Sequence, residues 1–279
     1  MSIITFWNGT KEQCGNTASA LALATYMAIE RNIKILFVST SLKDYSVEDS
    51  FWIKKKNGFL SMLGGNPGII SQAGIEGLDR IIRSNKLTPE IITDYSRIVL
   101  KNRLELLLGV NSSEAQYEEI RGKYPSIIGL ADKYYDLVVI DLDPKLGPTI
   151  QENILKKSDI IIGMIPQKLK EIEKVVDKIQ KNPYIKEKIM LTIGKYDDKT
   201  KYNAKNISRN VLKQKNIINT VPYNSLYFEA MREGKVIDLF LNFLRLTDMD
   251  RNYEFISEIQ RLAEDVKEKI RMAPRKREL

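Results

Sequence analysis

The sequence contains no histidine and only one cysteine, Cys14, in 279 residues. Without histidine, Ser-His-Asp and Cys-His catalysis and every histidine-ligated metal site are excluded. A single cysteine excludes an intramolecular disulfide and a zinc site built from several thiolates. Carboxylates, lysine and arginine side chains, hydroxyl groups and backbone amides therefore remain to carry any chemistry.

Long apolar runs are missing as well, since no segment approaches the roughly 20 apolar residues that span a bilayer. The first residues, 1–8, lack the basic region and cleavage site of a signal peptide. We therefore expect a cytoplasmic protein, with a peripheral position at the inner face of the membrane as an option. The net charge of +8 favours acidic partners such as nucleic acid, anionic lipid or nucleotide phosphates. A lysine-rich surface explains the same charge.

Short apolar segments alternate with amphipathic segments along the chain. Residues 2–7 and 34–39 are predicted strands, and residues 17–31 between them carry apolar side chains at helical spacing. This order forms a βαβ unit, which implies a parallel sheet. Further strands are expected at 104–108, 137–141, 160–165, 188–193 and 217–221. Further helices are expected at 75–84, 88–100, 168–181, 225–233, 235–246 and 252–272. The segment 114–135 is expected to be mostly helical, and Pro125 should start a new helix or kink an existing one.

This pattern predicts one α/β domain over residues 1–279. Its sheet is doubly wound and mostly parallel, with about seven strands and helices on both faces.

The loop after the first strand lies where this fold class binds phosphates, because free N–H groups at a helix N-terminus favour anions. A P-loop reads G-x-x-x-x-G-K-[ST]. The chain has Gly15 and Thr17 at two of these positions, but Asn16 replaces the lysine and the first glycine, Gly9, is displaced by one residue. An ordinary polar loop explains the pattern alone at least as well. The candidate nucleotide-binding residues are Gly9, Thr10, Glu12, Gln13, Cys14, Gly15, Asn16, Thr17 and Ala18.

A second candidate follows the apolar residues 137–140, where Asp141 ends a buried strand. A carboxylate at this edge of the sheet is what a Walker B strand uses to hold Mg²⁺. An aspartate that caps the next turn is the alternative. The two strands have the correct order for a P-loop protein, which favours the nucleotide interpretation.

Together these pieces resemble the ParA/MinD group of P-loop ATPases over nearly the whole chain. That group carries the loop K-G-G-x-G-K-T-T, whose early lysine reaches across a dimer interface to the partner's nucleotide. The resemblance places Lys11 at the early lysine, as a catalytic residue together with Asp141, and implies that Thr17 and Asp141 hold Mg²⁺ beside ATP or ADP. The segment Val221-Pro222-Tyr223 resembles the family segment near the base, which makes Pro222 a nucleotide contact.

The departures from the family pattern are equally specific. Asn16 replaces the phosphate lysine, and Ser39 and Ser41 stand where the family has an acidic D-x-D. Gly194 stands where the family often has a base-contacting asparagine. Removal of one electrostatic donor typically lowers a rate about 10²–10³-fold. We therefore expect weak or absent hydrolysis, with nucleotide binding as a hypothesis.

Within the group, residues 6–30 and 35–41 resemble the CpaE/TadZ proteins of Flp (Tad) pilus systems. The resemblance implies a homodimer that acts as a positioning scaffold for pilus or secretion assembly proteins. The alternative is an active ATPase that partitions DNA or positions a membrane complex by nucleotide-dependent dimerisation. A third interpretation is an α/β domain whose first loop binds no nucleotide.

The C-terminal segment 252–279 is predicted to be a helix with a basic tail. Apolar residues recur on one helix face, at Phe255, Ile259, Leu262, Val266 and Ile270. This face either packs on the core or, as in MinD-like proteins, lies on an anionic membrane. Nucleic acid is a weaker candidate partner for the tail, because no DNA-reading motif accompanies the basic residues.

Overall fold

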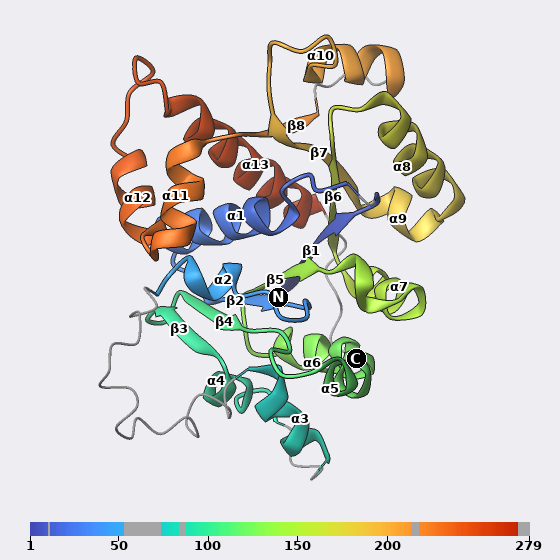
Figure 1. The fold of residues 1–279 in the computed structure, drawn as a ribbon, viewed down its shortest axis with the longest axis vertical. Helices are drawn as coiled ribbons and strands as arrows, with labels where there is room; N and C mark the ends of the chain where they lie inside the picture. Colours follow the sequence, from blue (N-terminus) through green and yellow to red (C-terminus); the bar gives the residue numbers. More distant parts are fainter. Residues whose placement is uncertain (11, 53–73, 84–87, 214–217, 273–279) are drawn as a thin grey trace.

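In the computed structural model, residues 1–10, 12–52, 74–83, 88–213 and 218–272 are described (Figure 1). Eight strands form one sheet in the order β3-β4-β2-β5-β1-β6-β7-β8. The strands are β1 (Ser2–Asn8), β2 (Ile35–Ser39), β3 (Arg97–Leu100), β4 (Leu104–Leu107), β5 (Leu137–Leu142), β6 (Ile160–Ile165), β7 (Ile189–Tyr196) and β8 (Asn219–Pro222). All neighbouring strands are parallel except β3, which runs antiparallel to β4.

Side chains of the central strands alternate between two separate apolar clusters. Ile4 and Phe6 of β1 belong to the cluster on one face of the sheet, and Ile3 and Trp7 belong to the cluster on the other. A strand buried on both faces needs a nearly continuous apolar sequence, which explains the composition of β1, β2, β5 and β6. The predicted doubly wound α/β sheet is therefore confirmed, with one strand more than the expected number.

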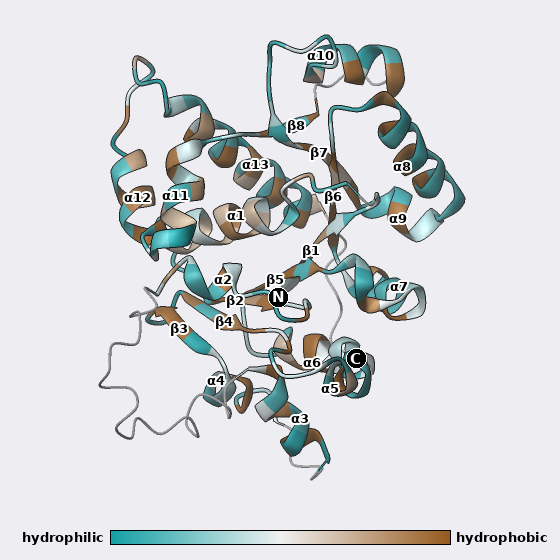
Figure 2. Cartoon of the chain, viewed as in Figure 1, coloured by the Kyte–Doolittle hydropathy of each residue, from teal (hydrophilic) through white to brown (hydrophobic). Residues whose placement is uncertain are grey.

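Helices cover both faces of the sheet (Figure 1). The first cluster includes residues of α1 (Asn16–Glu30), α2 (Ser46–Asp49), α11 (Ser225–Glu233), α12 (Val236–Phe243) and α13 (Tyr253–Met272). The second includes residues of α3 (Ile75–Arg83), α4 (Ile92–Tyr95), α5 (Glu114–Ile120), α6 (Tyr124–Ala131), α7 (Pro148–Lys157), α8 (Leu169–Lys181), α9 (Pro183–Lys188) and α10 (Ala204–Asn206). Figure 2 shows hydrophobic residues through the central strands and mixed character along helices such as α8.

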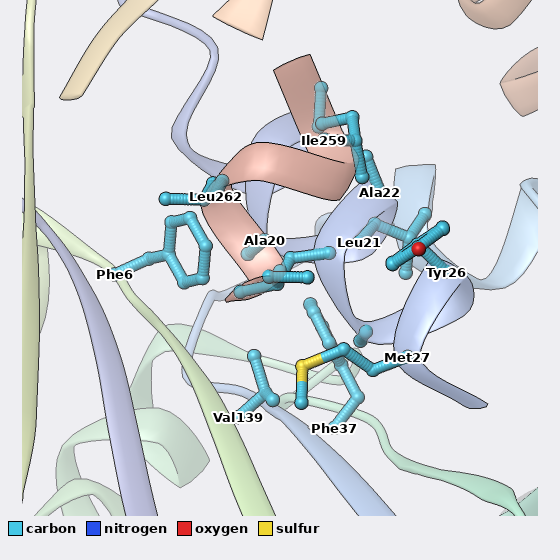
Figure 3. Close-up of a cluster of buried hydrophobic side chains, with 14 of the residues drawn as sticks. Phe6, Ala20, Leu21, Ala22, Tyr26, Met27, Phe37, Val139, Ile259 and Leu262 are labelled. Atoms are coloured by element: carbon cyan, nitrogen blue, oxygen red, sulfur yellow. The ribbon is translucent and has the colours of Figure 1, made fainter. Parts of the chain in front are cut away.

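The C-terminal helix α13 packs against α1 and the sheet (Figure 3). Ile259 and Leu262 lie beside Ala20 and Ala22, whose small side chains let the two helices approach closely. Four residues of the predicted apolar stripe are at most 2% exposed, namely Phe255, Ile259, Leu262 and Val266. This stripe therefore packs on the core, which confirms the core interpretation over the membrane interpretation. The basic tail at 273–279 lies outside the described residues.

One sequence prediction was wrong in this part of the fold. The expected helix at 88–100 is instead the short helix α4 followed by strand β3 at the edge of the sheet. Asn102 adopts a positive φ of 61° and turns the chain back into β4. Ile98 and Val99 are β-branched and suit a strand, and tertiary pairing with β4 decides the outcome. The helical segment expected at 114–135 consists of α5, a 3₁₀ turn and α6. Pro125 lies in the first turn of α6, which confirms that it starts a new helix.

The position of β1 determines where a ligand site can form. It lies between β5 and β6, so the chain leaves β1 toward one edge of the sheet and later continues toward the other. In open α/β sheets the crevice beyond the carboxyl ends of strands at such a reversal binds ligands. None of the helices in the described ranges combines the length and apolar character needed to cross a bilayer.

Candidate functional site

The loop that follows β1 is folded around the side chain of Asn8. The Asn8 amide nitrogen donates to the carbonyl oxygen of Glu12 at 2.7 Å. Its amide oxygen accepts from the backbone N–H of Thr10 at 3.0 Å and from the Thr10 hydroxyl at 3.1 Å. The same hydroxyl accepts from the backbone N–H of Glu12 at 3.1 Å. These bonds fix the first half of the loop, so Thr10 is a buried structural residue.

Gly15 sets the start of α1. It adopts φ 77° and ψ 31°, a left-handed conformation that favours glycine, and α1 begins at Asn16 without a side-chain cap. The first turn of α1 contains no acidic residue. A left-handed residue before uncapped N–H groups forms a concavity that suits an anion. The second half of the loop therefore has the backbone form of a phosphate cradle.

Strand β7 lies directly against this loop. A Cβ atom on Gly194 would be 1.9 Å from the carbonyl oxygen of Cys14, so only glycine allows the two backbones to approach this closely. Burial is the main cause that raises the pKa of the Cys14 thiol to about 11, so the thiol stays neutral and unreactive. The end of β7 is thus part of the site.

Asp141 at the end of β5 is bonded through both carboxylate oxygens. The Asn16 amide nitrogen donates to one oxygen at 2.6 Å, and the Thr17 hydroxyl donates to the other at 2.7 Å. Burial raises the pKa of Asp141 to about 6, further raised by Asp44 and Asp143 and opposed by the two hydrogen bonds. Asn16 also donates to the Phe6 carbonyl at 3.3 Å, and its own amide oxygen is buried with no hydrogen-bond partner among the described residues.

This arrangement fits a hard divalent cation in one respect. The Thr17 hydroxyl and the Asp141 carboxylate are adjacent oxygen donors, which is the ligand chemistry of Mg²⁺ when phosphate oxygens complete the shell. The Asn16 amide differs from a P-loop lysine, because it brings no positive charge and already occupies one Asp141 oxygen.

The end of β2 joins the same network. The Ser39 and Ser41 hydroxyls bond to each other at 2.8 Å, at the positions where the family resemblance implies acidic residues. The Thr40 hydroxyl donates to the Asp141 carbonyl at 3.0 Å and accepts from the backbone N–H of Asp143 at 2.8 Å. These hydroxyl groups hold the strand ends together without adding charge.

A cavity of about 920 Å³ opens above the loop. This volume lies in the range of small-molecule and cofactor sites, about 300–1,000 Å³. Its lining from the loop and α1 is Asn8, Glu12, Gln13, Cys14, Gly15, Asn16, Thr17 and Ala18. The remaining lining comes from α2, the segment after β5, the end of β7 and α11: Ser46, Asp49, Asp143, Pro144, Lys145, Lys195, Phe228, Met231 and Arg232.

Comparison with solved structures places this geometry in a known fold. A ParA family ATPase from Chlorobium tepidum TLS superposes with a TM-score of 0.63 and 13% identity, over 86% of this chain and 98% of that chain. A putative plasmid partition protein from Borrelia burgdorferi B31, bound to AMPPNP, superposes with a TM-score of 0.63 and 19% identity, over 96% of this chain and 99% of that chain. The septum site-determining protein MinD from Pyrococcus horikoshii OT3, complexed with Mg-ADP, superposes with a TM-score of 0.63 and 13% identity, over 98% of this chain and 99% of that chain. The chain has the ParA/MinD fold.

The likeness establishes the fold and no more, because 13–19% identity is too low to transfer an activity. No protein-family model matches the sequence, and no curated protein matches it.

Within the ParA/MinD fold, the predicted site residues divide into four groups. Residues 12–18 line the cavity, and Asp141 lies directly behind Asn16 and Thr17. Gly9 and Thr10 are buried and do not line it. Pro222 does not line the cavity but an adjoining niche of about 10 Å³, which shares Gly15, Ala18 and Lys195 with it. Lys11 lies outside the described residues, so its catalytic role stays a prediction.

Sequence reasoning missed the cations and the apolar wall of the cavity. Lys145, Lys195 and Arg232 bring positive charge, and Phe228 and Met231 bring apolar surface. Lys195 could have been found from the sequence, because it follows Gly194 at the end of a strand and the end of this strand lies near the loop in this fold. The α11 residues gave no signal, since only the packing of α11 against α2 and α12 brings them to the site.

Proposed function

We propose that the chain is a ParA/MinD-like nucleotide-binding protein with an eroded Walker A loop and weak or absent hydrolysis. It acts as a positioning or assembly scaffold of the CpaE/TadZ kind in a pilus or secretion system. The observation that carries the proposal is Asn16, which stands at the lysine position of the loop and donates to Asp141 instead of offering a charge.

Three features support nucleotide binding. The left-handed Gly15 and the uncapped start of α1 form a concavity for phosphate. Thr17 and Asp141 are paired at 2.7 Å and would hold Mg²⁺, which would neutralise charge on the phosphates. The cavity above them is large enough for a nucleoside triphosphate.

Two features support weak hydrolysis. A neutral amide at position 16 does not stabilise negative charge that develops on the phosphates, and one such donor contributes about 10²–10³ in rate. Ser39 and Ser41 bond to each other and provide no carboxylate to orient water. Loss of both groups should leave little turnover.

The remaining parts of the proposal rest on the family resemblance. Residues 1–279 would act as a single cytoplasmic domain, peripheral to the membrane where its assembly requires. The protein would form a homodimer through the face that carries the loop, with Lys11 reaching the partner's nucleotide. Replacement of Lys11 by alanine should then weaken self-association in analytical ultracentrifugation.

A second candidate function is an active ATPase for DNA partitioning or positioning of a membrane complex. The cations Lys145, Lys195 and Arg232 around the cavity favour it, because one of them could replace the missing lysine. The matched plasmid partition and septum site-determining proteins carry AMPPNP and Mg-ADP in their own structures.

The test is calorimetry with Mg-ATP and Mg-ADP, with phosphate release measured on the same sample. Binding without turnover supports the scaffold, whereas binding with turnover supports the active ATPase. If neither Mg-ATP nor Mg-ADP binds, both candidate functions are wrong, and the fold serves only to present surfaces to partner proteins. Asn16→Lys should raise ATP affinity, and Asn16→Ala is the matched control because it removes the bond to Asp141 without adding a charge.

A further inference from the structure

Lys195 occupies an unusual place at the end of β7. It follows Gly194, the residue whose backbone touches the loop at Cys14. Its φ is 49°, a left-handed conformation that is uncommon for a residue other than glycine, asparagine or aspartate. This conformation coincides with an irregularity in the pairing of β7 with β8, between Gly194 and Tyr196, at the point where β7 meets the phosphate cradle.

The side chain of Lys195 lies across the start of α1. Its Cγ and Cε atoms are 3.3 Å and 3.7 Å from the point that a Cβ atom on Gly15 would occupy. The aliphatic stem therefore runs over the left-handed glycine of the loop. Lys195 lines the same cavity as Asn16 and Thr17. Its positive charge acts on the loop, because it lowers the pKa of Cys14 against the larger effect of burial.

Two other lysines of the described part of the chain lie beside the loop and are already bonded. Lys168 pairs with the Glu12 carboxylate at 2.8 Å, and Lys178 donates to the Gly9 carbonyl. For Lys195, the described part of the chain offers no ion pair or hydrogen bond to the ammonium group. Lys145 and Arg232 also line the cavity, but they come from the segment after β5 and from α11. Lys195 is the cation whose stem touches the cradle.

We propose that Lys195 supplies the phosphate-facing positive charge that Asn16 lacks, and that its ammonium group binds the terminal phosphates of a nucleoside di- or triphosphate. The inference rests on the proposed nucleotide binding and identifies the residue that makes it effective. A lysine ammonium is a compact charge on a flexible stem, so it can reach phosphate from a neighbouring strand as well as from the loop itself. The role is electrostatic, involves no bond formation and concerns nucleotide binding; hydrolysis stays weak because Ser39 and Ser41 still provide no carboxylate to orient water.

The charge is tested by Lys195→Met, which keeps the stem over Gly15 and removes only the ammonium group. Lys195→Arg keeps the charge, and Lys199→Met is the matched control, since Lys199 is exposed nearby and does not line the cavity. Calorimetry is done with ATP, ADP, adenosine and tripolyphosphate. We expect Lys195→Met to weaken ATP and tripolyphosphate binding at least tenfold, with adenosine binding unchanged. Lys195→Arg and Lys199→Met should stay within about threefold of the wild type.

The outcomes separate this inference from the proposed function. If the wild type binds ATP and Lys195→Met binds it equally well, the inference is wrong while nucleotide binding stands. If the wild type binds neither ATP nor ADP nor tripolyphosphate, both are wrong. Equal loss of adenosine binding would show that Lys195 shapes the loop and does not bind phosphate.

A measurement on the unmodified protein keeps the test valid if the variant fails to fold. Acetylation of Lys195 by an amine-reactive reagent is followed by mass spectrometry with and without ATP. We expect ATP to protect Lys195 strongly, adenosine to leave it unprotected, and Lys199 to react equally in all samples. Unchanged acetylation of Lys195 in saturating ATP would overturn the inference.

Discussion

Replacement of Gly194 by alanine tests the contact on which the site depends. The added Cβ would lie 1.9 Å from the Cys14 carbonyl oxygen and 2.6 Å from the Cε atom of Met164. Non-bonded heavy atoms pack at about 3.5–4.0 Å, so the loop backbone must move. The Met164 side chain can rotate, but the carbonyl oxygen belongs to a loop that Asn8 and Thr10 hold in place.

The magnitude follows from overpacking. Extra methyl groups in a packed interior destabilise by about 1–3 kcal/mol, and we expect the upper end because the obstacle is backbone. For a chain of this size, about 3 kcal/mol corresponds to a Tm lower by about 6 °C. Displacement of Cys14 also moves Gly15 and the N–H groups of the cradle, so nucleotide affinity should fall at least tenfold.

The assay is thermal unfolding followed by circular dichroism, with calorimetry on the folded variant. Gly122→Ala is the matched control, because a Cβ atom at Gly122 meets nothing within 4 Å. It should leave the Tm unchanged or raise it slightly, as alanine restricts the unfolded chain. A Tm for Gly194→Ala equal to that of Gly122→Ala would refute the close approach of β7 to the loop.

Three further predictions concern the buried groups of the fold. The pKa of Asp141 is raised from 3.8 to about 6, so its contribution to stability is intact below pH 3.8 and is lost as the pH rises through 6. When urea unfolding is measured from pH 4 to 7, the free energy of unfolding of the wild type should fall by up to about 3 kcal/mol relative to that of Asp141→Asn. The same pH dependence of the unfolding free energy in both proteins would contradict this. Tyr227→Phe removes a buried 2.8 Å bond to the Ala18 carbonyl and should cost about 1 kcal/mol in the same assay, whereas no loss would argue against the bond. Leu262→Ala should cost about 2–5 kcal/mol because Leu262 is fully buried, with the 95% exposed Met249→Ala as a neutral control; equal effects would place α13 outside the core.

The positions of most strands could be read from the sequence because burial on both faces demands continuous apolar runs. The segment 137–141 is an example, and it appears as the central strand β5. The edge strand β3 could not be read in this way. Its residues are only partly buried, and pairing with β4 decides their conformation.

In the candidate site, too, some features could be read from the sequence and others could not. Gly15, Thr17 and Asp141 could be proposed from motif spacing, since a cradle needs a glycine before a helix and an acid at a strand end. The bond between Asn16 and Asp141 spans 125 residues and could not be read from either motif. The sequence did not decide which surface the helix 252–272 packs against, because an apolar stripe fits a protein core and a membrane equally well.

The sequence by itself determined the α/β class, the succession of strands and helices along the central part of the chain and the loss of the loop lysine, because these follow from local periodicity and residue identity. Only the tertiary structure decided which cations surround the cradle, that α13 covers α1, and that Lys195 lies over Gly15. These contacts join segments far apart in the chain, and their positions follow from the register and twist of the sheet, which no short segment of sequence contains.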